Sequence, residues 1–260
     1  MKIIVLVKQV PDTWGERKLD TATSLLDRGA SEAVIDEIDE RAVEVALSYR
    51  DNNKDAEVLL LTMGPAPATD VLRKGLAMGA DAAVHLLDET LAGSDAIWTS
   101  AVLAAAIGRS GYDLVIAGNE STNGRGGVVP AMVAEHLSVP HLTFLDSVEI
   151  SAESVTGQRA TEHGTLDLRA SLPAVVSVTE SSAEPRFPSF KGIMTAKKKP
   201  LDVLSLGDLG IDPATALAGV GHSVVLSISA RPARTAGKKI VDEGTAGVEL
   251  AEFLSAGHLI

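Results

Sequence analysis

A glycine-rich segment gives the clearest chemical signal in the sequence. Residues 114–127 read LVIAGNESTNGRGG, and the apolar stretch Val128–Leu137 follows directly. This order predicts a buried strand, a loop and the start of a helix, so that several backbone N–H groups and the positive end of the helix dipole face one place. Such a place favours phosphate. Ser121, Thr122 and Arg125 would supply further donors without a metal ion.

The glycine-rich segment is not one of the common phosphate motifs. It lacks the Gly-Lys-Ser/Thr of a Walker loop and the Gly-x-Gly-x-x-Gly of the dinucleotide-binding fold. Glycines that only permit a tight connection between a strand and a helix would explain the same residues. From this segment alone, both interpretations stay open.

Two other strand ends favour a ligand. The apolar run Ile3–Val7 is followed by Lys8–Asp12, and the run Val58–Thr62 is followed by Met63–Pro65. In open α/β sheets, ligands bind beyond the carboxyl ends of the strands, at the point where the strand order reverses. Together with the glycine-rich segment, these ends would enclose one nucleotide.

Acidic residues gather in the stretch IDEIDE, residues 35–40. Acids before a helix most often cap its N–H groups and complement its dipole, and the residues by themselves favour this role. A metal site is the alternative, but no His or Cys lies at a useful spacing. The six histidines show no Glu-x-x-His pattern and no triad order, so we assign no catalytic residue and no metal ligand.

Strand and helix patterns alternate through the first part of the chain. Besides the two strands above, Ala83–Leu87 and Leu114–Ala117 are apolar runs of strand length. Helical patterns lie between the runs, at Arg41–Tyr49, Ala68–Met78 and Asp95–Ile107. The alternation predicts an α/β fold with a doubly wound, mostly parallel sheet.

Later segments predict a small antiparallel excursion. Ser147–Ser151 and Thr165–Ala170 alternate apolar and polar residues around expected turns at Gly157 and at His163–Gly164, as hairpin strands do. Ala174–Val178 is again a continuous apolar run. We expect it to rejoin the main sheet.

The C-terminal part has a different character. From Ser181 onward, prolines interrupt every long helical pattern, and only Val248–Leu254 has a helical apolar spacing. We expect an α/β nucleotide-binding domain in residues 1–180 and a partner-recognition loop in residues 181–200. An extended C-terminal arm, residues 201–260, would dock on a partner subunit.

Two of the four Phe residues lie in a proline-bounded stretch of the expected recognition loop. Phe187 and Phe190 are accompanied there by Arg186 and Met194, and exposed residues of these types are typical interface anchors. The basic run Lys197–Lys199 predicts a solvated face or a patch for an acidic partner.

Composition excludes several classes of protein. The 260 residues carry a formal net charge of -12, which argues against nucleic acid as a partner because phosphate contacts need clustered Lys and Arg. No Cys is present, so disulfides, iron–sulfur clusters and thiol catalysis are excluded, and redox chemistry needs a borrowed cofactor. No apolar stretch reaches the roughly 18 residues of a transmembrane helix. We expect a cytoplasmic protein that is not embedded in a membrane.

An ordered set of short motifs resembles the β subunits of electron-transfer flavoproteins, and the resemblance covers essentially the whole chain. Each motif is weak by itself, but their order is highly specific. The motifs are Val5–Lys8, Gln9–Asp12, Ile38–Glu44, Met63–Pro65, Arg73–Asp81, the loop after Gly118, Leu172–Val176, Glu184–Arg186, Ile193–Lys199 and Arg234–Gly237.

The resemblance implies a heterodimer whose larger α subunit binds most of the redox-active FAD, while this chain holds a structural AMP. It also implies a ligand role, beyond capping, for residues 36–39. Carried over by position, the AMP site comprises Leu6, Asp36, Glu37, Ile38, Asp39, Met63, Gly118, Asn119, Glu120, Ser121, Thr122, Asn123, Gly124, Arg125, Gly126, Gly127, Val128 and Val129.

The resemblance further implies docking on acyl-CoA dehydrogenases, with Phe190 where many members have Leu. Electrons from these and other flavin dehydrogenases, as in fatty acid β-oxidation, would pass through the FAD to a membrane quinone oxidoreductase. The chain would then be an electron carrier subunit and not an enzyme by itself. The implied docking residues are Glu184, Pro185, Arg186, Phe187, Phe190, Ile193, Met194 and Lys197.

Two alternatives stay open. In bifurcating relatives a second FAD takes the place of AMP, and bound flavin in the isolated chain would favour that type. A non-redox nucleotide-binding module, similar to stress proteins, would share the strand-loop-helix phosphate site. Stable dimerisation without a larger partner would favour the module.

Overall fold

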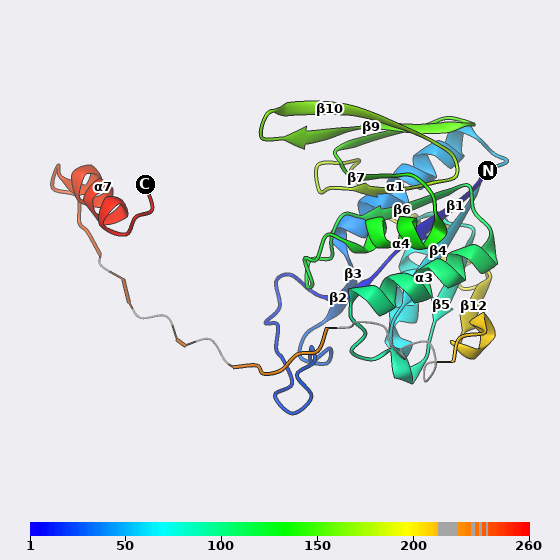
Figure 1. The fold of residues 1–260 in the computed structure, drawn as a ribbon, viewed down its shortest axis with the longest axis horizontal. Coiled ribbons are helices and arrows are strands. Elements are labelled where there is room, and N and C mark those ends of the chain that lie inside the picture. Colours follow the sequence, from blue (N-terminus) through cyan, green and yellow to red (C-terminus); the bar gives the residue numbers. More distant parts are fainter. Residues whose placement is uncertain (213–222, 230–231, 234–235, 238) are drawn as a thin grey trace. The chain divides into compact units, whose positions relative to one another are not determined.

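The computed structural model describes residues 1–212, 223–229, 232–233, 236–237 and 239–260 (Figure 1). They form two compact units, Met1–Leu226 and Ser227–Ile260. Arg234 and Thr235, which belong to the last motif of the family resemblance, lie outside the described residues.

A seven-stranded sheet is the centre of the first unit. Its strand order is β12-β5-β4-β1-β6-β11-β7, and every neighbouring pair is parallel. The central strands are continuous apolar runs because both of their faces are covered. The strands are β1 (Lys2–Leu6), β4 (Glu57–Met63), β5 (Ala82–Leu86), β6 (Leu114–Gly118), β7 (His141–Leu145), β11 (Ala174–Val178) and β12 (Leu201–Leu204).

Helices cover both faces of this sheet (Figure 1). On one face, α1 (Glu37–Asn52) and α2 (Thr69–Met78) pack in a cluster with Leu60 of β4. On the other face, α3 (Ala96–Ser110) and α4 (Val129–Leu137) pack in a cluster with Leu61. The predicted doubly wound α/β fold is therefore confirmed, and the strand order reverses between β1 and β6, where ligands are expected.

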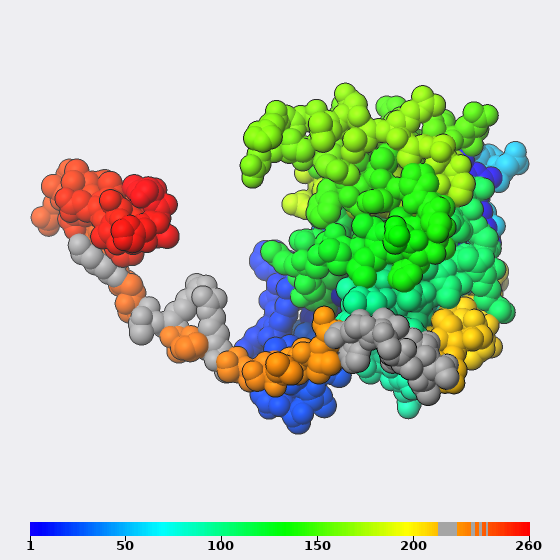
Figure 2. All heavy atoms as spheres, in the orientation of Figure 1, coloured from blue at the N-terminus to red at the C-terminus, as the bar shows by residue number. Residues whose placement is uncertain are grey.

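The antiparallel excursion is a separate three-stranded sheet of β8 (Ser147–Ile150), β9 (Ser154–Thr161) and β10 (Gly164–Ser171). Its yellow-green atoms form the uppermost layer of the first unit in Figure 2. Gly157, expected at a turn, instead lies inside β9 opposite Leu168, where a Cβ would overlap the carbonyl oxygen of Ser147. The expected turn at His163–Gly164 is confirmed. A further short ladder joins β2 (Gln9–Pro11) to β3 (Ala33–Ile35).

Two elements differ from the sequence-based expectation. The loop-like stretch after Pro188 contains a short helix, α5 (Phe190–Ala196), whose N-cap is the hydroxyl of Ser189. The first residues of the expected arm form β12 and pair with β5 as an edge strand of the main sheet. The described part also has three 3-10 turns, η1 (Ala66–Ala68), η2 (Glu89–Leu91) and η3 (Gly207–Leu209).

The described residues of the second unit include the helix α7 (Ala246–Ala256), which confirms the helical pattern seen at Val248–Leu254. Its apolar side chains Val248, Leu250 and Phe253 are exposed within this unit. Among the described helices of both units, none is long and apolar enough to span a membrane.

Candidate functional site

The glycine-rich segment forms a tight turn between β6 and α4. Ser121 closes this turn, because its carbonyl oxygen accepts from the N–H of Arg125 (2.9 Å) and its Oγ accepts from the N–H of Gly124 (3.2 Å). The N–H groups of residues 126–128 have no acceptor within the described part of the chain. These groups and the first turn of α4 are therefore available to an anion.

Asp36, at the start of α1, stabilises this turn through hydrogen bonds. It is the N-cap of α1, and its Oδ1 accepts from the N–H of Ile38 (3.0 Å). Its Oδ2 accepts from both the N–H (2.7 Å) and the hydroxyl (2.9 Å) of Thr122. The capping role favoured by the residues is thus confirmed, whereas contact of Asp36 with a nucleotide stays a prediction.

Asp39 lies one helical turn later and is buried against the end of β6. Its carboxylate accepts from the N–H of Lys8 (2.8 Å) and the N–H of Gly118 (3.1 Å). Burial raises the pKa of Asp39 well above its usual value, and the neighbouring Asp36 raises it further, while the two N–H donors act in the opposite direction. The carboxylate joins α1 to two strand ends at the switch point.

Other residues of the predicted AMP site meet on the opposite face of the sheet. Leu6, Met63 and Val129 all belong to the apolar cluster on the α3/α4 side. Asn119 follows directly after β6, and its N–H donates to the carbonyl of Val178 (2.8 Å). The residues of the predicted AMP site therefore form two groups, one on the α1 side of the sheet and one on the side of α3 and α4.

Asn119 is unusual because it is buried and its Oδ1 has no hydrogen-bond partner within the residues described. Buried polar atoms in folded proteins are nearly always paired, so an exception needs an explanation. A bound molecule with a donor at this position would supply the missing partner. Asn119 follows directly after β6, at the carboxyl end of the strands near the switch point where ligands are expected.

Lys8 is absent from the AMP-site residues carried over by position, although its strand end, Lys8–Asp12, was expected to help enclose a nucleotide. Its Nζ donates to the Oγ of Ser121 (2.9 Å) and to the Oδ1 of Asn123 (2.8 Å), so the ammonium lies within the glycine-rich turn. Burial lowers the pKa of Lys8, and the nearby Arg28 lowers it further. The available signal was a cation directly after the first strand, at the same switch point as the loop.

A groove of about 500 Å³ joins the two predicted functional regions. Five residues of the predicted AMP site and four of the predicted docking residues line it. They are Glu37, Ile38, Glu120, Thr122 and Arg125 from the first group, and Glu184, Pro185, Arg186 and Phe187 from the second. Sequence reasoning placed these groups in separate regions, and α1 brings them together.

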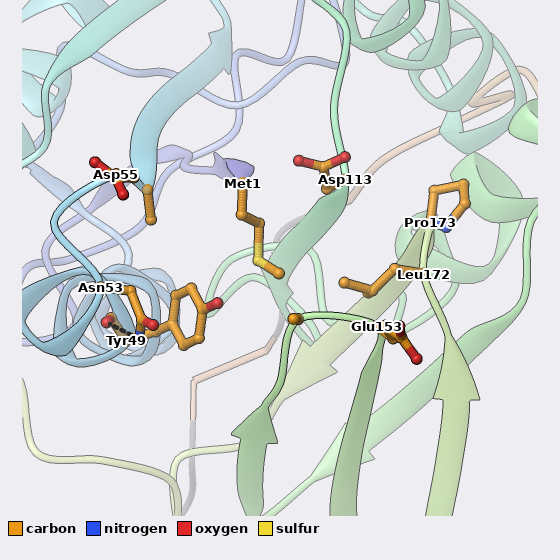
Figure 3. Close-up of a pocket in the computed structure, with 10 residues that line it drawn as sticks. Met1, Tyr49, Asn53, Asp55, Asp113, Glu153, Leu172 and Pro173 are labelled. Atoms are coloured by element: carbon orange, nitrogen blue, oxygen red, sulfur yellow. Dashed lines mark hydrogen bonds between the residues drawn. The ribbon is translucent and has the colours of Figure 1, made fainter.

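A second groove, of about 590 Å³, lies at the amino ends of the strands. Met1, Tyr49 and Leu172 face its middle (Figure 3). None of the predicted site residues lines it, so the sequence-based site and this groove are at opposite ends of the sheet.

The short helix α5 is held tightly on α2. Gly192 lies directly against the carbonyl oxygen of Ala77, where no Cβ would fit. Arg73 donates to the carbonyl of Ala196 (2.8 Å). The Nζ of Lys199 donates to three carbonyls at the end of α2, with a distance of 2.6 Å to that of Ala80. Lys199 is therefore a capping cation, which corrects the expectation that the whole basic run is a solvated face.

Arginines fix the chain before α5 onto α1. Arg186 forms a two-point ion pair with Glu44, with Nε–Oε2 of 2.7 Å and Nη2–Oε1 of 2.8 Å, and a further pair with Asp51 (2.7 Å). Arg41 donates to the carbonyl of Ser182 (2.9 Å). Arg186 thus has an internal structural role, and its contact with a partner stays a prediction.

The outward side of this segment is apolar. Phe187 is 95% exposed and Phe190 is 82% exposed, with Ile193 and Met194 also exposed beside them. Large apolar side chains gathered on a rigid surface typically mark an interaction site. Lys197 is exposed at the end of the same helix.

Comparison with known proteins agrees with this architecture. The family model described as electron transfer flavoprotein domain matches residues 23–209. A protein of Mycobacterium tuberculosis (strain ATCC 25618 / H37Rv), named electron transfer flavoprotein subunit beta, is 52% identical over 264 residues that cover 99% of both chains. This chain belongs to the β-subunit family of electron-transfer flavoproteins.

Other relatives in the electron-transfer flavoprotein family are more distant. The subunit beta of Megasphaera elsdenii is 34% identical over the full length of both chains. A protein of Acetobacterium woodii named caffeyl-CoA reductase-Etf complex subunit CarD is also 34% identical, over 98% of this chain and 96% of the relative. The family match favours electron transfer over the non-redox module considered from the sequence.

The ion pair between Arg186 and Glu44 makes the stability of this flavoprotein subunit pH-dependent. Burial would raise the pKa of Glu44, but hydrogen bonds from Arg186 and Ser48 outweigh burial, and the pKa lies below its usual 4.5. A lowered pKa means that ionised Glu44 stabilises the fold above about pH 4.5 and that this contribution is lost as the pH falls further. Glu44→Gln is expected to lower the free energy of unfolding by about 1–3 kcal/mol at pH 7.

Urea unfolding at pH 7 and near pH 3 checks this expectation. The difference between wild type and Glu44→Gln should shrink at the lower pH. Glu57→Gln is the control, because its pair with Lys2 is long (3.9 Å) and exposed, and it should cost only a few tenths of a kcal/mol. A deficit of Glu44→Gln that is equal at both pH values would contradict the role given to the charge.

Proposed function

We propose that this β-type subunit holds a structural AMP at the glycine-rich turn and pairs with a larger α subunit that binds most of the FAD. The FAD, when bound, supplies the redox chemistry, and this chain supplies the scaffold and the docking surface. Electrons would come from acyl-CoA and other flavin dehydrogenases and leave to a membrane quinone oxidoreductase. The exposed apolar face of α7 suits contact with the α subunit.

The observation that carries the nucleotide part is the buried Oδ1 of Asn119, directly after the carboxyl end of β6, which has no partner among the described residues. This oxygen would accept a hydrogen bond from a donor such as a hydroxyl or an amino group of a nucleoside. The free N–H groups of residues 126–128 and the ammonium of Lys8 would receive the phosphate. The residues present therefore fit an adenine nucleotide.

A second candidate is the bifurcating type, in which FAD takes the place of AMP. The relative from Acetobacterium woodii, named as part of a caffeyl-CoA reductase complex, favours this alternative. FAD contains the same adenosine phosphate half as AMP, so the donors and acceptors described above suit both.

Cofactor content separates the two candidates. We expect the complex of this chain with its α subunit to release one FAD and one AMP per heterodimer when it is denatured and its nucleotides are quantified by chromatography. Two FAD and no AMP would establish the bifurcating type. A complex without adenine nucleotide in this subunit would overturn the nucleotide proposal.

Docking is expected to depend on Phe190. Because this side chain is 82% exposed, Phe190→Ala removes a potential anchor and leaves the fold unchanged. We expect the affinity of the heterodimer for an acyl-CoA dehydrogenase, measured by calorimetry, to fall by roughly tenfold or more. The AMP and FAD content should stay the same.

Val203→Ala is the matched control for Phe190→Ala. Val203 is also an exposed apolar residue (53%), but it lies on the edge strand β12. Its replacement should leave the affinity unchanged. Equal loss of affinity and nucleotide in Phe190→Ala would contradict the separation of the docking surface from the nucleotide site.

A further inference from the structure

Strand β7 contains a bulge beside the glycine-rich turn. Leu142 pairs with Val176 and Leu145 pairs with Val178, so two residues of β7 oppose the single residue Ser177 of β11. The second of the two, Phe144, has a φ of 59°. This left-handed conformation crowds the Cβ of an L-residue and is most often adopted by glycine.

Hydrogen bonds on both sides hold the bulge. The N–H of Phe144 donates to the Oγ of the buried Ser177 (3.0 Å). The carbonyl of Thr143 accepts from the Nε of Arg159 (2.6 Å), which reaches over from the antiparallel sheet. The strained conformation is thus fixed by several neighbours, and strain of this kind in folded proteins gathers at functional sites.

The bulge directs the ring of Phe144 onto the glycine-rich turn. A Cβ added to Gly127 would lie 3.2 Å from the Cζ of Phe144, so the ring occupies the space directly beside Gly127. Gly127 itself has a φ of 66°. Phe144 is 39% exposed and belongs to neither of the two apolar clusters, so core packing does not explain an aromatic residue here.

We propose that Phe144 is a positioning residue of the nucleotide site. Its ring holds the second half of the glycine-rich turn, so that the N–H groups of residues 126–128 stay directed to the phosphate. A glycine or asparagine would relieve the backbone at position 144, but it would leave Gly127 without the neighbouring ring. The proposal rests on the proposed nucleotide function for its ligand, although the position of the ring is independent of that function.

Three variants separate the ring from the backbone. Phe144→Ala removes the ring and keeps the crowded Cβ, Phe144→Gly removes both, and Phe144→Tyr keeps the ring. Hydrogen exchange of the intact heterodimer, followed by mass spectrometry of peptides that cover residues 121–129, reports directly on the turn. Release of AMP or FAD on denaturation gives the second readout.

We expect exchange in residues 121–129 to accelerate by roughly three- to tenfold in both Phe144→Ala and Phe144→Gly, and to stay at the wild-type rate in Phe144→Tyr. Nucleotide content should fall in the first two variants, although Phe144→Gly should have the higher melting temperature of the pair. If the bulge were only structural, glycine at position 144 would relieve its backbone and leave the turn protected. Loss of protection in both variants would therefore show that the turn depends on the aromatic ring.

Wild-type protection of the turn in Phe144→Gly would overturn the proposal and make the bulge a structural feature only. Retained protection in Phe144→Ala would do the same. If the wild-type complex holds neither AMP nor a second FAD, the proposed nucleotide function fails, but the exchange rates still decide whether Phe144 positions the turn. The two failures are therefore distinguishable.

Discussion

Replacing Gly192 by alanine is expected to displace α5 from α2 and to disable the docking surface. The added Cβ would overlap the carbonyl oxygen of Ala77, and a main-chain atom cannot rotate away. Because alanine has a higher helix propensity than glycine, a loss of stability in Gly192→Ala would mean that the steric overlap outweighs the gain in helix propensity. We expect the free energy of unfolding to fall by about 1–3 kcal/mol. The affinity for an acyl-CoA dehydrogenase should fall by about a hundredfold, because several apolar anchors move together.

Gly108→Ala is the matched control for Gly192→Ala. Gly108 also lies in a helix, and a Cβ there would have no neighbour within 4 Å. This variant should gain about 0.5–1 kcal/mol of stability and should bind the dehydrogenase normally. Thermal unfolding and calorimetric titration of both heterodimers provide the comparison. If Gly192→Ala binds as tightly as Gly108→Ala, α5 is not the docking surface.

Replacing Gly118 by alanine should damage the nucleotide site and the fold together. A Cβ at this position would lie 2.6 Å from the Oδ1 of Asp39 and 3.1 Å from the Cγ2 of Ile38. Asp39 would have to move, and the N–H groups of Lys8 and Gly118 would lose their buried acceptor. We expect a loss of about 2–4 kcal/mol of unfolding free energy. Most of the bound adenine nucleotide should also be lost, measured by chromatography after denaturation.

A double-mutant cycle tests this explanation. Asp39→Ala alone removes the buried acceptor, and Gly118→Ala in that background no longer meets a carboxylate oxygen. The second substitution should therefore cost much less in the Asp39→Ala background than in the wild type. Full additivity of the two losses would show that Gly118 is needed for a reason other than the space taken by Asp39.

The strands of the main sheet were predictable where burial on both faces makes the sequence uniformly apolar. Ala174–Val178 was predicted with its observed bounds as β11. By contrast, β7 and β12 were missed, because these edge strands carry polar residues such as His141 and Asp202 and depend on pairing with distant segments. An edge strand has only one neighbour to impose a pattern on its residues.

The candidate site was predictable in outline and not in its contacts. The glycine-rich loop and the capping role of Asp36 follow from local sequence, since a strand, a turn and a helix start are adjacent in the chain. The contacts of Lys8 depend on residues that are distant in the sequence, since Lys8 contacts Ser121 across 113 positions. The orientation of Phe144 depends on a backbone φ of 59°, which the residue type does not predict. Likewise, Lys199 belongs to a basic run, and only the fold shows that it caps α2.

The way in which α5 is attached has a consequence for evolution. Its inward residues, Gly192 and Ala196, are constrained by packing against α2, whereas Phe187 and Phe190 are almost entirely in water. Substitutions at the two outward positions carry little folding cost. Under the docking role proposed for this surface, lineages would be able to exchange one partner for another by changing a few surface side chains, without altering the sheet and its helix contacts.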